Sequence, residues 1–374
     1  MKTLRSFSIL AGSLLLASSA FAQIQLTPPV AQTPAAKPKP KPVVVPKKPA
    51  AETKAPATTP PTATVIPAPA PNDPRVDLVY GAFQRGEYRT ARDLAMTRAQ
   101  AGDPKAMTML GELYSNALGT KRDDAKAVDW YKRAADNGDR EAMFELAMMR
   151  FEGRGGPTDR MEAARLLASS AKLGEPKAAY NLALLYLDGQ TLPQDLRRSA
   201  ELLRLAADAG NADAQYALAT FYKEGTGVPK DLEKAAELLQ MAALADNVDA
   251  EVEYAIALFN GTGTPKNEPA AIALLRKAAK QNSPIAQNRL ARVLVLGQGV
   301  PMDRIEGLKW HLIAKTSGKG DLMLDEVFAQ LSPEDRSKVE ALAHRWLGDQ
   351  VGISQVGVSQ VGSKQAGGSQ AGSK

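Results

Sequence analysis

The sequence predicts an all-α protein, a right-handed α-solenoid of stacked helical hairpins built on a 36-residue repeat. Alanine recurs every 36 residues from Ala106 to Ala286, and a small residue follows each of these alanines five positions later. Glycine and, in most units, proline then interrupt the pattern before an Asp or Asn that can begin a second helix. One hairpin cannot bury its own apolar face, so successive units must stack on one another.

The first predicted element is a secretory signal peptide at residues 1–22. A positively charged start precedes an apolar stretch, and Ala20-Phe21-Ala22 fits the small-residue cleavage pattern. Cleavage between Ala22 and Gln23 predicts a periplasmic or secreted protein. The alternative is an uncleaved anchor, but the apolar stretch is shorter than the roughly 20 residues that a spanning helix needs. No later segment reaches that length, so no membrane span is expected after cleavage.

Two further segments are predicted to be disordered. Residues 23–74 form a Pro/Lys-rich linker that contains the run Lys37-Pro-Lys-Pro-Lys-Pro. Proline lacks an amide donor and fixes φ, so this linker is expected to be extended polyproline II. It serves either as a spacer held near anionic cell-wall or lipid groups, or as a tether that contacts nothing specific. Residues 348–374 repeat a glycine-containing pentapeptide with few large apolar side chains to offset chain entropy.

The helical array lies between these segments. An N-terminal hairpin is predicted at 75–105, with its first helix over 76–85 and its second over 87–102. Six complete units follow over 106–321, and capping helices close the array at 322–347. Each second helix begins at an Asp or Asn whose side chain can accept a backbone amide, which predicts N-caps at Asp123, Asp159, Asp195, Asp231, Asn267 and Asp303. Each second helix ends at a residue that tolerates the left-handed region, namely Gly138, Gly174, Gly210, Asp246, Asn282 and Gly318.

Together these positions resemble the Sel-1-like repeat (SLR) family of tetratricopeptide-type solenoid proteins, of the exported bacterial type. The fourth unit carries the resemblance best, through Ala214, Leu218, Tyr222, Gly225 and Asp231. The resemblance implies structural repeat residues, protein or peptide partners and no shared catalytic residues. One exported branch is Cys-rich and is associated with β-lactam binding or hydrolysis, and this chain has no Cys. Other exported members act on sensor kinases, which makes an envelope signalling component one form of the expected function.

Charge and composition narrow the chemistry. The chain has 374 residues, a formal net charge of +6, no Cys and two His. Residues 23–71 carry +5 whereas residues 72–347 carry −2, so the basic residues do not cluster on the folded part and no nucleic-acid partner is expected. Without Cys and with two His, neither a disulfide framework nor a metal site is predicted, and no cofactor is expected.

A binding surface is predicted on the first helices, which line the concave side of tetratricopeptide-type solenoids. The third, seventh and tenth positions of each unit share one helix face and vary between units, unlike the fold-defining positions. Aromatic and Met side chains on such a face suit recognition of a peptide or helix. The alternative is packing between adjacent first helices. The candidate partner-binding residues are Phe144, Met148, Phe151, Tyr180, Leu184, Leu187, Tyr216, Thr220 and Lys223, and Val252, Ile256 and Phe259 continue the pattern.

No catalytic residues are predicted. Ser169-Ser170-Ala171-Lys172 reads S-x-x-K, but the S-D-N and K-T-G companions of penicillin-binding serine enzymes are absent. His311 stands where Tyr131 stands in the first unit, which predicts a packed helix residue rather than a metal ligand. The sequence therefore predicts an exported scaffold or regulator that binds a partner on its concave surface and is not an enzyme. The alternative is an envelope hydrolase acting on cell-wall or β-lactam-like substrates, which would need a convergent polar cluster there.

Overall fold

The computed structural model describes residues 77–362, with side chains described as far as residue 348. The predicted signal peptide, the Pro/Lys-rich linker and residues 363–374 lie outside the described residues. Within 77–362 the chain forms 16 helices, α2 to α17, which alternate as the first and second helices of hairpins. The first helices are α2 (Leu78–Gln84), α4 (Pro104–Ser115), α6 (Arg140–Glu152), α8 (Pro176–Asp188), α10 (Ala212–Glu224), α12 (Val248–Asn260), α14 (Pro284–Leu296) and α16 (Leu322–Ala329). The second helices are α3 (Tyr88–Gln100), α5 (Asp124–Asp136), α7 (Arg160–Lys172), α9 (Leu196–Asp208), α11 (Leu232–Leu244), α13 (Glu268–Lys280), α15 (Arg304–Thr316) and α17 (Pro333–Gly362).

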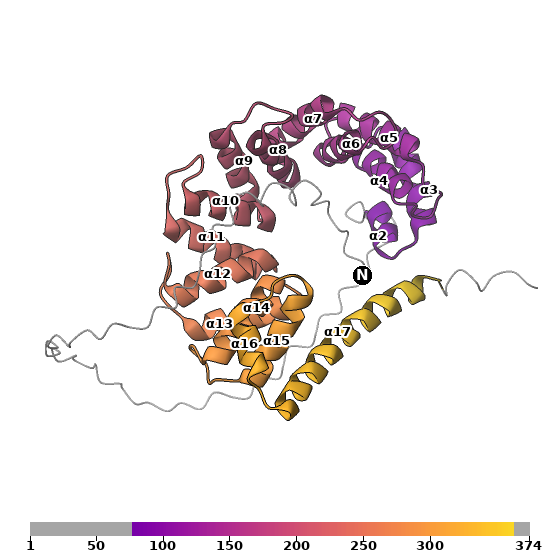
Figure 1. Cartoon of the computed structure of the whole chain (residues 1–374). Helices are drawn as coiled ribbons and strands as arrows, with labels where there is room; N and C mark the ends of the chain where they lie inside the picture. The colour runs from indigo at the N-terminus through magenta and orange to yellow at the C-terminus, as the bar shows by residue number, and fades with distance from the viewer. Residues whose placement is uncertain (1–76, 363–374) are drawn as a thin grey trace, which may run out of the picture.

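The hairpins follow one another around an arc (Figure 1), which confirms the predicted all-α solenoid. The helices α4, α6 and α8 lie on the inner side of the arc, and α5, α7 and α9 lie on the outer side. From α2 to α15, neighbouring helices pack on one another in chain order, both within a hairpin and between hairpins, whereas α17 packs mainly on α15. The first helices therefore line the concave side in this part of the solenoid.

The small residues of the 36-residue pattern lie at the contacts between helices. Because these side chains are small, two helix backbones can approach closely there, as the pattern predicts. Leucines from the same helices fill the space beside them, and Leu110 and Leu290 have no exposed surface. The alanines at the first position of units two to six are likewise completely buried: Ala142, Ala178, Ala214, Ala250 and Ala286.

The predicted helix boundaries are confirmed by the capping contacts. The Asp159 carboxylate accepts the amide of Glu162 at 2.8 Å and caps α7. The Asn267 side chain accepts the amide of Ala270 at 3.1 Å and caps α13 in the same way. Each of these bonds satisfies one of the amides that a helix start leaves without a partner. Asp246 and Asn282 follow the ends of α11 and α13 with φ of +61° and +65°.

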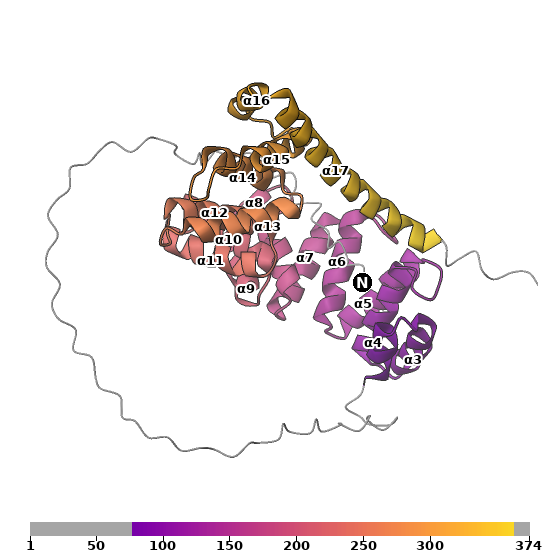
Figure 2. The ribbon, with the colours of Figure 1, turned by 90° about the horizontal axis from the view of Figure 1, so that it is seen from below.

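The last helix is longer than the sequence pattern indicates. The capping helices were expected to end at residue 347, whereas α17 continues to Gly362, well into the glycine-containing pentapeptides. No proline follows Pro333 in the chain, and an isolated glycine costs a helix only about 1 kcal/mol relative to alanine. Glycine spaced five apart therefore weakens α17 without ending it. In Figure 2, α17 leaves the C-terminal end of the arc and runs towards its N-terminal half.

Candidate functional site

The nine candidate residues form what we call the concave stripe: Phe144, Met148 and Phe151 on α6, Tyr180, Leu184 and Leu187 on α8, and Tyr216, Thr220 and Lys223 on α10. All nine are half-buried, so none belongs wholly to the core or wholly to solvent. Phe144 and Tyr180 pack with one side on the buried core of α6–α10. Each of the two rings therefore has one packed flank and one accessible flank.

The stripe ends at α12. The equivalent residues of that helix, Val252, Ile256 and Phe259, are buried and belong to the core of the C-terminal repeats. In α4 the third position is the buried Thr108. The accessible apolar surface predicted from the repeat pattern is thus confined to α6, α8 and α10.

Lysine side chains approach the stripe from neighbouring repeats. The Lys177 ammonium lies 5.8 Å from the centre of the Phe144 ring, at a distance that allows a cation–π contact. The Lys223 ammonium lies 2.9 Å from the Glu253 carboxylate on the next first helix. The stripe therefore combines apolar side chains with groups that contact an ammonium, namely the Phe144 ring and the adjacent Glu253 carboxylate.

Carboxylates that the sequence analysis did not single out lie beside the stripe at its N-terminal end. Burial, together with the nearby Glu112 and Glu141 carboxylates and against the opposing effect of Lys177, raises the pKa of Glu145 to about 7. Burial also raises the pKa of Glu112, again with a contribution from Glu141. The three carboxylates lie on the adjacent first helices α4 and α6 and repel one another. This part of the surface carries negative charge that its own lysine does not fully offset.

A second group of carboxylates lies beside the two tyrosines of the stripe. Burial and the Asp213 carboxylate raise the pKa of Tyr180 to about 12. Burial, followed by Asp249 and Glu253, raises the pKa of Tyr216. Both phenols therefore stay protonated at neutral pH and keep an O–H that can donate to a partner. The negative charge extends along the concave side from α4 to α12.

A pocket of about 200 Å³ opens at the N-terminal end of this surface. Its lining includes the aromatic rings of Tyr80 and Phe83 on α2, the Met109 side chain, and the Glu112 and Glu141 carboxylates. Tyr80 is 54% exposed, so its ring is accessible to a ligand. The pocket continues the combination of aromatic rings and carboxylates found along the stripe.

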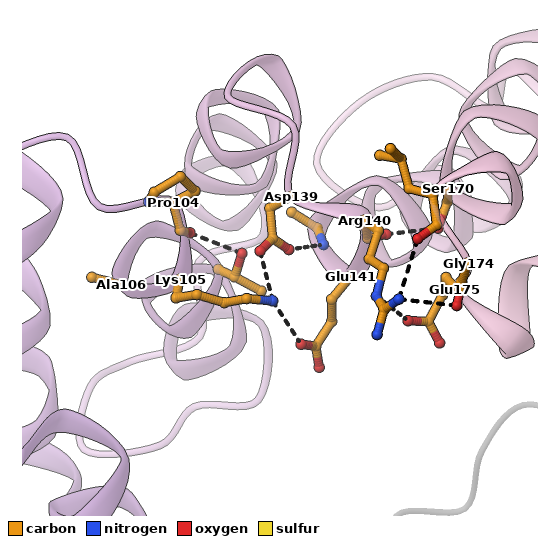
Figure 3. A network of polar contacts seen from close by, with 12 residues as sticks. Pro104, Lys105, Ala106, Asp139, Arg140, Glu141, Ser170, Gly174 and Glu175 are labelled. Atoms are coloured by element: carbon orange, nitrogen blue, oxygen red, sulfur yellow. Dashed lines mark hydrogen bonds and ion pairs between the residues drawn. The ribbon is translucent and has the colours of Figure 1, made fainter. Parts of the chain in front are cut away.

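The turns between repeats are joined by polar contacts (Figure 3). The Lys105 ammonium lies 2.8 Å from Asp139 and 3.9 Å from Glu141. The Asp139 side chain is almost completely buried and also accepts the amide of Ala142 at 2.8 Å. Asp139 thus caps α6 and ties it to the preceding first helix.

Ser170, which lies inside the Ser169-Ser170-Ala171-Lys172 segment, belongs to the next of these junctions. Its hydroxyl donates to the Arg140 carbonyl at 2.7 Å, and Ser170 has no exposed surface. The Arg140 guanidinium donates back to the carbonyls of Leu173 and Gly174 at 3.2 and 3.1 Å. The hydroxyl thus joins two repeats.

His311 is a packed helix residue, as predicted. It has no exposed surface, and its Nε2 lies 2.8 Å from Asp325 on α16. The Lys315 ammonium lies 2.7 Å from the same carboxylate. Hydrogen bonds from Lys315 and then His311 lower the pKa of Asp325. These contacts fasten α16 to the last repeat.

Among the described residues, no three His, Cys, Asp or Glu side chains are grouped so that they could hold a metal ion. None of the helices within 77–362 combines the length and apolar character needed to cross a membrane.

Neutralising Glu145 is expected to stabilise the protein at alkaline pH. The folded-state pKa of about 7 lies above the ordinary value of 4.5, so ionisation of Glu145 opposes folding. The associated stability is present below about pH 4.5 and is lost as the pH rises through 7. Glu145→Gln should therefore raise the free energy of unfolding by about 2–3 kcal/mol at pH 8 and leave it nearly unchanged at pH 4.

Urea denaturation at the two pH values measures this difference. Glu237→Gln is the matched control, because Glu237 is exposed on the outer helix α11. An equal effect of Glu145→Gln at both pH values would show that folding does not raise the pKa of Glu145.

Comparison with known proteins adds the following findings. A solved Sel1 repeat protein from Oxalobacter formigenes is 24% identical with a TM-score of 0.56, covering 63% of this chain and 94% of that one. A solved protective antigen of uropathogenic Escherichia coli with an SLR fold is 25% identical with a TM-score of 0.51, covering 77% of this chain and 69% of that one. No curated protein sequence matches significantly. The Sel1 repeat profile matches six consecutive segments, 104–139, 140–175, 176–211, 212–247, 248–283 and 284–319.

Proposed function

The chain belongs to the Sel1 repeat family, and from that premise we propose that it is an exported scaffold that binds a protein or peptide partner on its concave stripe. An envelope signalling role is one form of this function. The carrying observation is that the nine stripe residues stay half-buried along three consecutive first helices, while the equivalent residues of α12 are buried. A surface of accessible rings on a rigid scaffold suits recognition of a peptide or helix.

Export is supported by the signal peptide predicted at residues 1–22. Binding rather than catalysis is supported by the stripe itself, which is formed mostly of aromatic and aliphatic side chains.

The double variant Tyr180→Ala with Tyr216→Ala tests this proposal. Binding anchors usually cost 2 kcal/mol or more when truncated, so the affinity for a partner captured from an envelope extract should fall at least about 30-fold per tyrosine. Thermal stability should change little, because both rings are only half-buried. Core aromatics would instead cost about 3–5 kcal/mol of fold stability.

The matched control is Leu205→Ala with Leu244→Ala. These leucines are 59% and 79% exposed and lie on the outer helices α9 and α11. The control should retain the partner. If the tyrosine variant unfolds, or if it binds the partner as tightly as the control does, the stripe is not the recognition surface.

A further inference from the structure

The chain contains a segment whose positive charge and proline-rich backbone are complementary to the concave surface. Residues 37–48 read KPKPKPVVVPKK, with five lysines and no acidic residue. Proline at alternate positions favours polyproline II, which is extended and loses little entropy on binding. Aromatic-lined surfaces are the usual docking sites for such segments. The sequence analysis left the role of this segment open between an envelope contact and a plain tether.

The concave surface supplies the complementary groups at two places. At its N-terminal end, the pocket places the rings of Tyr80 and Phe83 beside the Glu112 and Glu141 carboxylates. Farther along, Asp213 lies close enough to Tyr180 to raise its pKa. A ring therefore lies near a carboxylate at both places, and each offers a proline contact beside a lysine contact.

The basic side chains already on this surface are engaged. The Lys105 ammonium pairs with Asp139 at 2.8 Å, and the Lys223 ammonium pairs with Glu253 at 2.9 Å. The Arg98 guanidinium, which lines the pocket, pairs with Asp77 at 2.9 Å. Glu141 and Asp213 are exposed, although Glu141 lies 3.9 Å from the Lys105 ammonium and Asp213 accepts a hydrogen bond from the Asn247 side chain at 3.0 Å. These carboxylates offer an incoming ammonium a favourable position at low desolvation cost.

We propose that residues Lys37–Lys48 dock on the concave surface of the same chain, with prolines against the rings of α2, α6 and α8 and lysines beside Glu141, Asp213 and Asp249. The proposal rests on the proposed function, because it assigns the same surface an internal ligand. The docked segment competes with an external partner for that surface. Such a partner must then carry similar chemistry, namely basic residues on an extended, proline-containing strand.

The connection between the segment and the solenoid is long enough. Residues 49–76 lie between the segment and α2, and at about 3.1 Å per residue they span up to roughly 85 Å. The inner surface begins at α2, so the segment reaches it without rearrangement of the repeats. Tethering also gives an effective concentration in the millimolar range, so a weak contact is sufficient for occupancy.

The absence of Cys from the chain allows a direct test. In the full chain, Val44→Cys creates a unique site for a nitroxide spin label, and methyl-labelled methionines report its position. Met148 in the stripe and Met109 in the pocket should lose at least half of their NMR signal intensity relative to the same sample after reduction of the nitroxide. Met241, which is exposed on the outer helix α11, should keep its intensity.

A charge variant separates docking from mere tethering. Glu141→Gln, Asp213→Asn and Asp249→Asn together remove exposed carboxylates from the inner surface and should restore most of the Met148 and Met109 intensity. The control changes Glu201→Gln, Asp208→Asn and Glu237→Gln on the outer helices α9 and α11 and should leave the broadening unchanged.

Three results would overturn the proposal. They are no broadening at Met148 and Met109, broadening that the charge variant leaves intact, and broadening that appears when spin-labelled and methyl-labelled chains are mixed. The last result would assign the segment to a second copy. None of these results affects the tyrosine variants, because those measure an external partner. Failure of the internal ligand is thus distinguishable from failure of the proposed function.

Discussion

Replacing Gly263 with alanine is expected to destabilise the solenoid by roughly 2–5 kcal/mol. Gly263 has a φ of +68°, and the left-handed region costs an alanine about 1–2 kcal/mol. In addition, a Cβ at this position would overlap the carbonyl of Leu232, at the start of the second helix of the preceding repeat. Two backbones cannot separate without disturbing the repeat interface, so a further cost of about 1–3 kcal/mol is expected.

Gly210→Ala is the matched control for the backbone conformation. Gly210 has a φ of +86°, but an added Cβ would meet no atom within 4 Å. The control should therefore lose about 1–2 kcal/mol. Urea denaturation of the two variants isolates the contribution of the close approach between repeats. Equal losses would contradict the packing of this loop on the preceding repeat.

The same glycine shows what the sequence can and cannot predict. The 36-residue pattern places a break at Gly261 and Gly263, because glycine and Pro265 exclude a continuous helix. Caps such as Asp159 are equally local, since the side chain bonds an amide three residues away. The contact between Gly263 and the Leu232 carbonyl is not local. It depends on how the repeats stack, which no single unit encodes.

The candidate site likewise has one part that the sequence predicts and another that it does not. The stripe was predictable because Phe144, Tyr180 and Tyr216 occupy one helix face at 36-residue spacing. The carboxylates beside it were missed, because Glu112 and Glu145 occupy different positions of their units, and only Glu145 has an acidic counterpart in phase, Glu253. They come together through the packing of α4 against α6. A signal was present in the charge balance, since the folded part is acidic whereas the preceding segment is basic.

Departures from the repeat consensus in one unit are expected to compensate one another, and the first unit provides the clearest case. Gly111 stands where the other five units have alanine. Tyr131 stands where units two to five have leucine, and it is 2% exposed. A Cβ on Gly111 would lie 2.5 Å from the Tyr131 ring. The missing methyl group therefore makes room for the larger side chain.

Each single change at this pair should destabilise the protein. Gly111→Ala gains up to about 1 kcal/mol of helix propensity but forces a buried ring to move, for a net loss of about 1–2 kcal/mol. Tyr131→Leu leaves a cavity beside Gly111 and should cost about 2 kcal/mol. The double variant recreates the combination of Ala147 with Leu167, both of which are completely buried in the second unit. Its stability should return to within about 1 kcal/mol of the parent chain.

Urea denaturation of the four proteins gives the coupling between the two positions, which is expected to be about 3 kcal/mol in favour of the matched pairs. Gly307→Ala with Tyr131→Leu serves as the control for unrelated positions, because the Cβ of residue 307 would meet Val295 in the last repeat instead. Its two effects should add. Additive effects at Gly111 and Tyr131 would contradict the direct packing of the ring on the glycine. Coupling at Gly111 and Tyr131 alone would show that one substitution in a repeat is compensated by another within the same hairpin. Residues of the inner surface could then vary independently of this packing.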